Sequence, residues 1–433
     1  MTSTRNPQLA EFRTLWLGQI VSMLGSGVTA FALAIWIYTA THSAGQMAIM
    51  AACGMLPGLL LAPLLGVFLD RWDLRRAMLL AHLAAGLGAA ITIALFRAGT
   101  LQYWHLYVIG AGRSCLTAVH WPAFTVATQL LVPVKQLGRA AGATQFADAA
   151  TQLLSPVLGG LLVGSTGLSG VLAVEVLCAG AGVCSLLWLT IPERVLGSVG
   201  PVRNSFLVEV AAGWNYLAQQ RGLVALLGLS CVSNAAVSFL EMLSAPVVLA
   251  VASSAVLGLV RSLAGAGMLA GSVLMTVWGG PRDRIVGVIG FQCLFGAFMV
   301  AMGVAATPMA MAIAGFSGLF FLPLVNGCAQ TLWQTTVEPH VQGRVFSLRR
   351  LPLLFRPLGY LVSGLAADKL VDPYLRDHAG LNWLTGHAGG RGGALLLVIA
   401  GFGTVLATAA SYCYRPLRDL EQGRAPSPSL GAQ

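Results

Sequence analysis

Charged residues are scarce in this chain, and so are lysines and closely spaced cysteine pairs. Only 9% of the 433 residues are Asp, Glu, Lys or Arg, against about 25% in a typical soluble domain. The two lysines, Lys135 and Lys369, both follow residues other than glycine, so the chain has no Walker A loop for ATP. The eight cysteines form no CxxC pair, which argues against a zinc site and against a disulfide framework.

Apolar residues, by contrast, make up 57% of the chain, and the mean hydropathy is +0.78. This composition is typical of a protein whose surface mostly faces lipid. The net charge of +10 does not indicate nucleic-acid binding, because the cations lie in short turns between apolar runs and form no single patch. His82 and His120 are isolated in the sequence, and neither indicates a metal ligand. We therefore expect a membrane protein without a metal ion or cofactor.

Twelve apolar runs are each close to the roughly 20 residues that cross a bilayer core. The predicted spans are 14–38, 45–69, 77–96, 104–131, 140–164, 168–191, 223–250, 255–279, 285–304, 307–334, 345–370 and 393–414. They define a six-helix bundle at 1–192 and a second one at 222–414. The polar linker 193–221 contains an amphipathic segment at 206–217, and the tail 415–433 is predicted to be disordered.

The positive charges predict the orientation of the spans. Of the 25 Lys and Arg residues, eighteen lie in one set of loops and four lie in the opposite set. The remaining three, Arg113, Arg261 and Arg356, lie within spans. Because cytoplasmic loops carry the excess of Lys and Arg, both termini and the linker are predicted to be cytoplasmic.

The two halves of the chain repeat one pattern, 213 residues apart. Gly54-Met55-Leu56, Gly58, Gly66 and Asp70-Arg71 recur as Gly267-Met268-Leu269, Gly271, Gly279 and Asp283-Arg284. A duplication of six spans around a cytoplasmic middle loop predicts two bundles that enclose a cavity near the midplane and expose it to each side in turn. A channel needs no such duplication, and an intramembrane enzyme needs a catalytic set.

The loop between the second and third spans carries glycine, acidic and basic residues at fixed spacing: Gly66, Asp70, Arg71, Arg75 and Arg76. This set resembles the loop signature of the major facilitator superfamily, and Asp73 gives the variant DRxD form found in its macrolide-efflux-like drug:proton antiporters. Similarity to that branch continues in Arg113-Ser114, His120-Trp121-Pro122-Ala123, Leu131-Val132-Pro133, Gly343-Arg344-Val345-Phe346-Ser347-Leu348, Pro357-Leu358-Gly359 and Gly389-Gly390-Arg391-Gly392. The resemblance implies an all-α membrane protein with twelve transmembrane helices in two pseudo-symmetric six-helix bundles, the major facilitator fold. It also implies a location in the bacterial cytoplasmic membrane.

The fifth span carries a second signature, which antiporter-type exporters of the superfamily share. Its positions hold Gly142, Thr151, Ser155, Pro156, Gly159 and Gly160, where the signature has glycines and one proline. Pro156 weakens the helix ladder, and the small residues let a neighbouring helix approach closely. Ordinary close packing of helices is the structural alternative. The Pro-x-x-Gly-Gly spacing favours export.

Asp70 is predicted to act as a latch on the cytoplasmic side. The resemblance implies that it bonds to the N-terminal end of the eleventh span and to a nearby arginine, with the rest of the loop signature in the same gate. Asp283 and Arg284 repeat the acid and the base, but Val288 and Ile289 replace the last two arginines. The gating role is therefore assigned to the first copy. A solvated turn that merely follows the positive-inside rule is the alternative.

Arg113 and Asp148 form the sharpest hypothesis for proton coupling. Counted from the span ends, each lies about 13 Å deep in a core of about 30 Å. Opposite charges on consecutive helices neutralise each other, and a buried carboxylate beside a cation has a tunable pKa. We expect Asp148 to exchange the proton and Arg113 to respond to its charge, with a static ion pair as the alternative. Glu175 in the sixth span is a second candidate, unless it only lines a wet outer vestibule.

Four further polar residues are candidates for the substrate cavity: Asn234, Glu241, Asn326 and Arg356. A structural bridge between Glu241 and Arg261 is the alternative for the first acid. Arg356 has no obvious partner in the sequence, so it either attracts an anionic substrate group or contacts carbonyls freed by Pro357. Both asparagines are equally consistent with helix packing.

These features, together with the resemblance, predict a monomeric secondary transporter that exports amphipathic small molecules in exchange for protons. Its expected partners are the substrate, protons and the lipid bilayer, without nucleic acid. Transport of a siderophore or a lysophospholipid by the same fold is the alternative, and a channel belongs to a different class. An intramembrane protease is a further alternative, because residues 167–170 and 315–318 both read GxSG, but no histidine base lies in a later span.

Overall fold

The structure is a computed structural model that describes residues 7–61, 73–133, 136–189, 214–337, 345, 348–349, 351–377 and 390–422. The regular elements in these ranges are all helices. The chain forms two compact units. Unit 1 comprises Met1–Val195, Val248–Ser262 and Gly364–Asp368, and unit 2 comprises Leu196–Val247, Leu263–Ser363 and Lys369–Gln433. Two short segments from the second half of the sequence therefore belong to unit 1.

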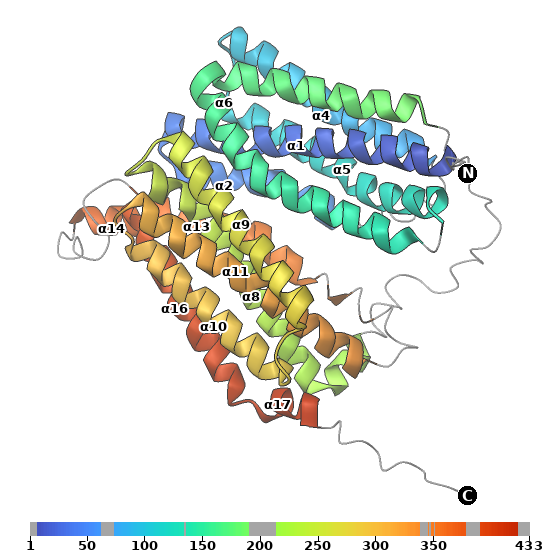
Figure 1. Cartoon of the computed structure of the whole chain (residues 1–433). Helices are drawn as coiled ribbons and strands as arrows, with labels where there is room; N and C mark the ends of the chain where they lie inside the picture. The colour runs from blue at the N-terminus through green and yellow to red at the C-terminus, as the bar shows by residue number, and fades with distance from the viewer. Residues whose placement is uncertain are drawn as a thin grey trace, which may run out of the picture. The chain divides into compact units, whose positions relative to one another are not determined.

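Long helices make up the described part of the first half (Figure 1). They are α1 (Pro7–Thr41), α2 (Ala44–Cys53), α4 (Leu74–Arg97), α5 (Tyr103–Leu131) and α6 (Leu137–Leu187). The side chain of Asp73 accepts the N–H of Arg75 at 2.9 Å and so caps α4. Ser43 caps α2 in the same way, and Asp368 accepts the N–H of Gly45 at 2.7 Å. Such caps fix where each helix begins, because the first N–H groups have no partner within the helix.

A single bend at Gly167 joins two predicted spans, 140–164 and 168–191, into α6. The backbone there has φ 67° and ψ −172°, a conformation that essentially only glycine adopts. Figure 1 shows the two limbs of α6 meeting at this bend and running back beside the other helices of unit 1. The expected loop between the fifth and sixth spans is therefore reduced to one turn.

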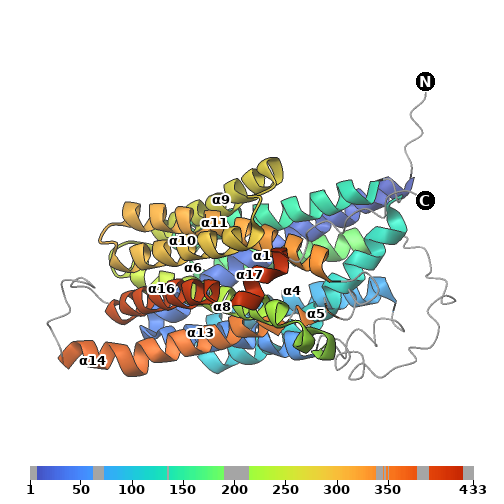
Figure 2. The same cartoon turned by 90° about the horizontal axis from the view of Figure 1, so that it is seen from below.

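The second half contributes a similar series of helices, one of which is interrupted. They are α8 (Arg221–Leu249), α9 (Ser254–Trp278), α10 (Arg284–Val304), α11 (Pro308–Thr336), α13 (Phe355–Ala366), α14 (Asp372–Asp377), α16 (Arg391–Tyr412) and α17 (Arg415–Gln422). Around α13, the predicted span 345–370 changes to a 3₁₀ turn at Leu351–Leu354 and to a π-helical turn at Ala367–Val371. α10 packs against both α11 and α16 (Figure 1 and Figure 2). Gly296 and Gly401 face each other there, so α10 and α16 approach closely.

Nine helices in the described ranges are long and apolar enough to cross a membrane. This number is lower than the twelve predicted spans for reasons that the elements themselves show. α6 contains two spans in one run, and the eleventh span is interrupted on both sides of α13. α5 has 29 residues, but Arg113 and two histidines lower its apolar character.

Repeated glycines make equivalent contacts in the two halves. A Cβ on Gly58 would lie against Ser114 of α5, and the N–H of Gly58 donates to the Ser114 Oγ at 3.0 Å. A Cβ on Gly271 of α9 would lie against the carbonyl oxygen of Phe320 in α11. In each half, the second span therefore packs closely on the fourth. The duplication itself stays a prediction.

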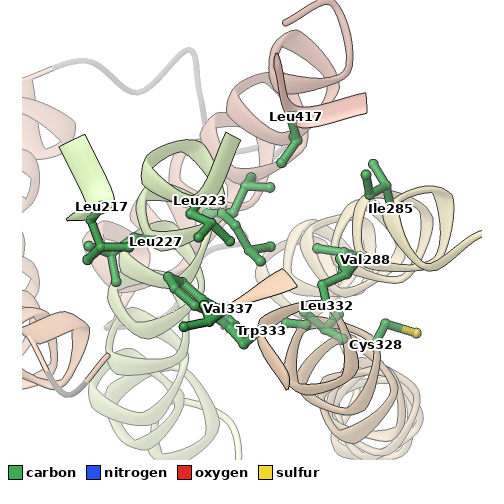
Figure 3. Close-up of a cluster of buried hydrophobic side chains, with 14 of the residues drawn as sticks. Leu217, Leu223, Leu227, Ile285, Val288, Cys328, Leu332, Trp333, Val337 and Leu417 are labelled. Carbon is green, nitrogen blue, oxygen red and sulfur yellow. The ribbon is translucent and has the colours of Figure 1, made fainter. Parts of the chain in front are cut away.

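Unit 2 has an apolar core in which side chains from several helices converge around Trp333 (Figure 3). The labelled members are Leu217, Leu223, Leu227, Ile285, Val288, Cys328, Leu332, Trp333, Val337 and Leu417. Val288 belongs to this core, although the first half has an arginine at the matching position. Leu217 precedes α8 and Val337 follows α11, and the other labelled members come from α8, α10, α11 and α17. Their burial therefore holds together helices that are far apart in the sequence.

The tail differs from the sequence expectation. Disorder from residue 415 onward was the wrong expectation for residues 415–422, which form α17. Leu417 is 1% exposed within the unit 2 core, and the guanidinium of Arg418 lies 5.6 Å from the ring centre of Tyr412. The low hydropathy of this segment conceals one apolar face, which Leu417 and Leu420 provide. The predicted linker 193–221 is described only from residue 214.

Candidate functional site

A buried ion pair lies at the centre of unit 1. The Glu175 side chain is fully buried, and its Oε1 lies 2.7 Å from Nη2 of Arg113. The hydroxyl of Ser26 donates to the same carboxylate oxygen at 3.2 Å, and Arg113 donates to the Ser26 Oγ at 3.3 Å. Side chains from α1, α5 and α6 thus form a closed triangle in which each member contacts the other two.

Close packing of α1 on α6 positions this triangle. A Cβ on Gly25 would lie 2.5 Å from the Cβ of Cys178 and 3.5 Å from the Cα of Glu175. The missing side chain lets the backbone of α6 come within reach of Ser26, the next residue of α1. Glu175 follows the bend at Gly167 by eight residues, about 12 Å along the helix, so the carboxylate lies well inside the unit.

Glu175 and Arg113 line a cavity of about 280 Å³ inside unit 1. Its walls come from α1, α2, α4, α5 and α6, and Thr29, Thr92 and Thr117 supply hydroxyl groups. Two buried atoms in the wall, Oε2 of Glu175 and Oγ1 of Thr29, have no hydrogen-bond partner within the described ranges. A buried polar atom without a partner is costly, and this cavity is large enough for water. The orphaned atoms therefore indicate a hydrated chamber that reaches the carboxylate.

The observed partner of Arg113 is Glu175, the second candidate. Asp148 lies in the first limb of α6, but its side chain is outside the described part of the structure. The Arg113–Asp148 pair therefore stays a prediction. Reasoning from consecutive spans favoured Asp148, whereas the bend in α6 brings the second limb of that helix against α1.

His82 and His120 meet inside unit 1, so the interpretation of two isolated histidines was wrong. Their ring centres are 4.9 Å apart with the planes at 78°, and Nδ1 of His82 lies 2.8 Å from Oγ of Ser22. Both histidines are buried. Sequence distance hid this contact, because His82 belongs to α4 and His120 to α5. In the described ranges, no group of three His, Cys, Asp or Glu residues is arranged to hold a metal ion.

Unit 2 contains an ion pair of its own. Nη2 of Arg356 lies 2.5 Å from Oε1 of Glu241, and the hydroxyl of Tyr360 donates to Oε2 of the same carboxylate at 2.5 Å. The side chains of Arg356 and Glu241 are 30% and 41% exposed, whereas in the pair of unit 1 Arg113 is 22% exposed and Glu175 is fully buried. Arg356 thus has a partner that the sequence did not predict, 115 residues away on α8.

The two candidate asparagines differ in their surroundings. The Nδ2 of Asn234 donates to the carbonyl oxygen of Ser230 at 2.9 Å, which is one turn earlier on α8. Asn326 lies exposed on α11. Neither arrangement tests the predicted role in a substrate cavity, which stays a prediction.

The loop signature lies only partly within the described residues, because Gly66, Asp70 and Arg71 fall outside them. The expected contact of Asp70 with the start of the eleventh span also falls outside, so the latch stays a prediction. Nη2 of Arg75 donates to the carbonyl oxygen of Leu187 at 2.7 Å, at the C-terminal end of α6, where a cation is favourable. Nε of Arg76 lies 3.7 Å from Oδ2 of Asp73 on the exposed surface.

In the second half, the repeated acid caps a helix. Asp283 accepts the N–H of Val286 at 3.3 Å at the start of α10. Glu421 of α17 accepts the N–H groups of Arg284 and Ile285 at 2.9 and 3.2 Å. Burial raises the pKa of Glu421 above its usual value; the bond from the Arg284 N–H opposes this rise, and the hydrogen bond with Asp283 adds to it. These contacts fasten α17 to the start of α10.

Glycines of the fifth-span signature lie at two helix contacts inside unit 1. A Cβ on Gly159 would lie 2.7 Å from the Phe31 ring of α1, and a Cβ on Gly160 would lie 2.8 Å from the carbonyl oxygen of Ser254. Both neighbours would have to move to admit a side chain. The surroundings of Gly142 are outside the described part of the structure.

Pro156 lies within the first limb of α6, and the start of α9 packs on its turn. A Cβ on Gly258 would lie against the carbonyl oxygen of Pro156. The hydroxyl of Ser262 donates to the carbonyl oxygen of Leu153 at 2.6 Å, one turn before the proline. The close approach that the signature predicts is therefore present, and its role in export stays a prediction.

Comparison with known proteins supplies a family. The profile described as Major Facilitator Superfamily matches residues 15–351. Macrolide efflux protein A of Streptococcus pyogenes is 29% identical over 379 residues, which cover 83% of this chain and 90% of the relative. The protein of that name in Enterococcus faecalis is 29% identical over 317 residues, or 69% of this chain and 94% of the relative. Enterobactin exporter EntS of Salmonella typhimurium is 28% identical over 223 residues, about half of each chain.

Solved structures resemble this chain over almost its whole length. A bacterial homologue of the human lysosomal transporter Spinster, inward-facing and unoccupied, has a TM-score of 0.70 at 16% identity and covers 97% of this chain and 98% of its own. The D-xylose–proton symporter has a TM-score of 0.67 at 15% identity, with coverage of 97% and 99%. At these identities the likeness concerns the fold alone.

Proposed function

Because this chain belongs to the Major Facilitator Superfamily and is a transporter, not an enzyme, we propose that it exports amphipathic small molecules across the bacterial cytoplasmic membrane in exchange for protons. The similarity to macrolide efflux proteins supports macrolides as one substrate class. Each bundle carries its own charge pair, and alternating access between two such bundles is the mechanism that the six-plus-six repeat supports. Both termini are cytoplasmic in this proposal, in accordance with the arginine-rich loops.

The buried carboxylate of Glu175 is the single observation that carries the proposal. Ionisable groups within a membrane bundle are costly and typically serve ion or proton transfer. Glu175 has one oxygen held by Arg113 and Ser26, and its other oxygen is orphaned in the wall of the chamber. Because only Oε1 is held in the ion pair, Oε2 can bind a proton without first breaking the contact with Arg113.

Arg113 couples protonation of Glu175 to the rest of unit 1. While Glu175 is ionised, the two charges neutralise each other. Once Glu175 is protonated, the guanidinium loses its counter-charge in a site of low dielectric constant, and the unit favours an arrangement in which Arg113 is solvated or paired elsewhere. A change of one charge at Glu175 thus shifts the conformational equilibrium, which is what an antiporter requires of its proton site.

The Glu241–Arg356 pair of unit 2 is the better candidate for contact with substrate, because it is partly exposed. Its carboxylate and guanidinium offer binding to either sign of charge on an amphipathic molecule. Tyr360, on the turn after Arg356, adds an aromatic face and holds the carboxylate in place. Asn234 and Asn326 remain proposed members of the same substrate cavity.

Transport in proteoliposomes tests the function. In proteoliposomes with an acidic lumen, the outward-directed proton gradient drives uptake by exchange. Purified wild type should then accumulate a radiolabelled macrolide above equilibrium, and an uncoupler should abolish the accumulation. Glu175→Gln should lose accumulation by about a hundredfold, the usual contribution of a group that transfers a proton. The same variant should still exchange labelled for unlabelled macrolide, because exchange needs no net proton movement.

Asp148→Asn tests the alternative proton carrier in the same experiment. If Asp148 is the carrier and Glu175 a static partner, the Asp148 variant loses accumulation and the Glu175 variant keeps it. Full accumulation by Glu175→Gln at normal protein level contradicts the assignment to Glu175. Dissipative flux by the wild type, unaffected by an uncoupler, contradicts proton-coupled export and indicates a channel.

Siderophore export is a second candidate, since about half of the chain also matches an enterobactin exporter. Enterobactin-like catecholate compounds carry acidic groups, for which Arg356 is the complementary charge. A competition experiment separates the two candidate substrates. A catecholate siderophore that inhibits macrolide exchange at micromolar concentration is a ligand of this protein, and a siderophore that does not inhibit the exchange is excluded as a substrate.

A further inference from the structure

A second polar cluster of unit 1 has no part in the ion pair. It consists of Ser22 on α1, His82 on α4 and His120 on α5, and all three side chains are buried. Ser22 and His82 share a hydrogen bond of 2.8 Å, and the edge of one imidazole faces the plane of the other. The Nε2 of His120 has no hydrogen-bond partner in the described ranges.

Space for the His82 ring comes from α6. A Cβ on Gly182 would lie 2.8 Å from Nδ1 and 2.9 Å from Cε1 of that ring. Gly182 of α6 therefore packs directly against the imidazole of His82. An apolar side chain in place of this histidine would fill the same space in a membrane bundle at a lower desolvation cost. Two neutral imidazoles and a hydroxyl each present one donor and one acceptor, which is the requirement for passing a proton along.

The polar face of α1 connects this cluster with the ion pair. Ser22 lies four residues before Ser26, so the two hydroxyls are about 6 Å apart along one helix face. One water molecule with two hydrogen bonds of about 2.8 Å spans such a gap. Ser26 contacts both Glu175 and Arg113. Thr29, with its orphaned hydroxyl, continues the same face into the chamber beside Glu175.

Gln19 extends the face in the opposite direction. It precedes Ser22 by three residues, is buried, and has an Oε1 without a hydrogen-bond partner among the described residues. His82 lies eight residues after the start of α4 at Leu74, about 12 Å from the 73–76 turn. The polar face thus leads from Glu175 toward the end of the unit that is cytoplasmic in the proposed orientation.

We propose that Ser22, His82 and His120 form a proton relay between Glu175 and the cytoplasmic end of unit 1, separate from the path of the substrate. This proposal rests on the proposed function of Glu175 as the proton carrier. The protonated carboxyl of Glu175 rotates so that the oxygen carrying the proton faces Ser26. Ser26 receives that proton and gives up its own proton through the bridging water to Ser22. Ser22 passes a proton to Nδ1 of His82. After the two rings turn from their edge-to-face arrangement, His82 gives its Nε2 proton to the unpartnered Nε2 of His120, and His120 releases its Nδ1 proton toward the cytoplasmic end. Each step breaks one O–H or N–H bond as it forms another, and one proton leaves for each that enters.

The relay is tested by comparing two activities of the same proteoliposomes. A pH dye in the lumen reports proton movement driven by a macrolide gradient, and labelled macrolide reports exchange at equal pH. His82→Phe and His120→Phe should lower the proton flux about tenfold or more, in the range expected for the loss of a proton-transfer group. Exchange should stay within about twofold of wild type, because it needs no proton transfer. His82→Gln, which keeps a donor and an acceptor, should restore part of the proton flux.

His105→Phe is the matched control, since His105 lies on α5 at the far end from the 73–76 turn and bonds only locally, to the N–H of Gln102. It should leave both activities unchanged. Equal proton flux in wild type and both Phe variants overturns the relay. Ser22→Ala is a smaller change that serves as the check on folding. If both Phe variants and Ser22→Ala lose flux and exchange in parallel, with a lowered melting temperature, the cluster serves packing and the relay is overturned. If Ser22→Ala loses proton flux but keeps exchange, the relay is supported. Absence of proton movement in the wild type refutes the proposed function itself, and with it the relay.

Discussion

The ion pair of Arg113 and Glu175 shows that each charge inside unit 1 is stabilised by the opposite charge of its partner. Either charge alone would stand in a bundle interior of low dielectric constant, and together they leave only one oxygen without a partner. The contact between Arg76 and Asp73 on the exposed surface is the opposite case. There the charges are 3.7 Å apart, with side chains 82% and 51% exposed, so water screens them.

A double-mutant cycle measures this difference. Arg113→Leu leaves the Glu175 carboxylate unpaired, and we expect it to lower the free energy of unfolding in mixed micelles by about 3–5 kcal/mol. The double variant Arg113→Leu/Glu175→Leu should be more stable than Arg113→Leu alone, since it removes the orphaned charge. Arg76→Leu is the control and should change stability by less than about 1 kcal/mol. A double variant that is less stable than both single variants would contradict a mutually dependent pair.

The raised pKa of Glu421 predicts that the stability of the folded protein depends on pH. Because its pKa is raised in the folded state, the folded protein binds this proton more tightly than the unfolded chain does. The resulting stabilisation is fully present below the usual pKa of a glutamate and is lost as the pH rises through the raised pKa. The melting temperature of wild type relative to Glu421→Gln should therefore fall as the pH is increased from acidic values. A difference that grows with pH would contradict the assignment.

At the scale of the helix, α6 is the element on which the site depends. Its bend brings Glu175 back along α1, and the same limb supplies the glycine that accommodates His82. Its C-terminal carbonyl at Leu187 binds Arg75 of the loop signature. One helix therefore touches the ion pair, the histidine cluster and the signature loop, so a distortion of α6 should affect all three.

Gly167→Ala tests the bend directly. The backbone conformation at residue 167 is strained for any residue with a Cβ, and we expect a loss of about 1–3 kcal/mol in the free energy of unfolding. Gly164→Ala is the matched control three residues earlier, at a helical position where a Cβ would meet nothing within 4 Å. It should be neutral or stabilise by up to about 1 kcal/mol, since alanine favours helix over glycine. Equal effects of the two substitutions would refute a specific requirement at the bend.

At the scale of the whole molecule, the loop charges predict the orientation of the chain in the membrane. In a variant without native cysteines, Thr100→Cys and Arg282→Cys place single thiols in exposed turns at opposite ends of their units' spans. A membrane-impermeant maleimide should label Thr100→Cys in intact cells, and should label Arg282→Cys only after permeabilisation. The reversed pattern would invert the proposed topology, and with it the direction of the proton relay.

Several sequence predictions are confirmed, and particular residues show why others were not. Helical membrane spans and membership of the Major Facilitator Superfamily follow from apolar runs and a short loop signature, which are local properties of the chain. The contact between Arg113 and Glu175 was not predicted, because neighbouring spans in sequence were taken as neighbours of the charge; the Arg113–Asp148 pair stays a prediction. The expected disorder after residue 414 failed for a similar reason, since two leucines on one face of α17 matter more than its mean hydropathy.

Composition and periodicity alone determined that this chain is a helical membrane protein, because the cost of exposing polar backbone to lipid leaves few other folds open to it. The pairing of the charges inside the bundles was not determined in this way. Which acid meets which arginine, and whether two histidines touch, depends on the faces that packed helices turn toward each other. Those faces are set by glycines such as Gly25 and Gly182 at helix contacts and by one bend at Gly167. Only the tertiary structure decides them, because a rotation of a helix by one residue turns a side chain by about 100°.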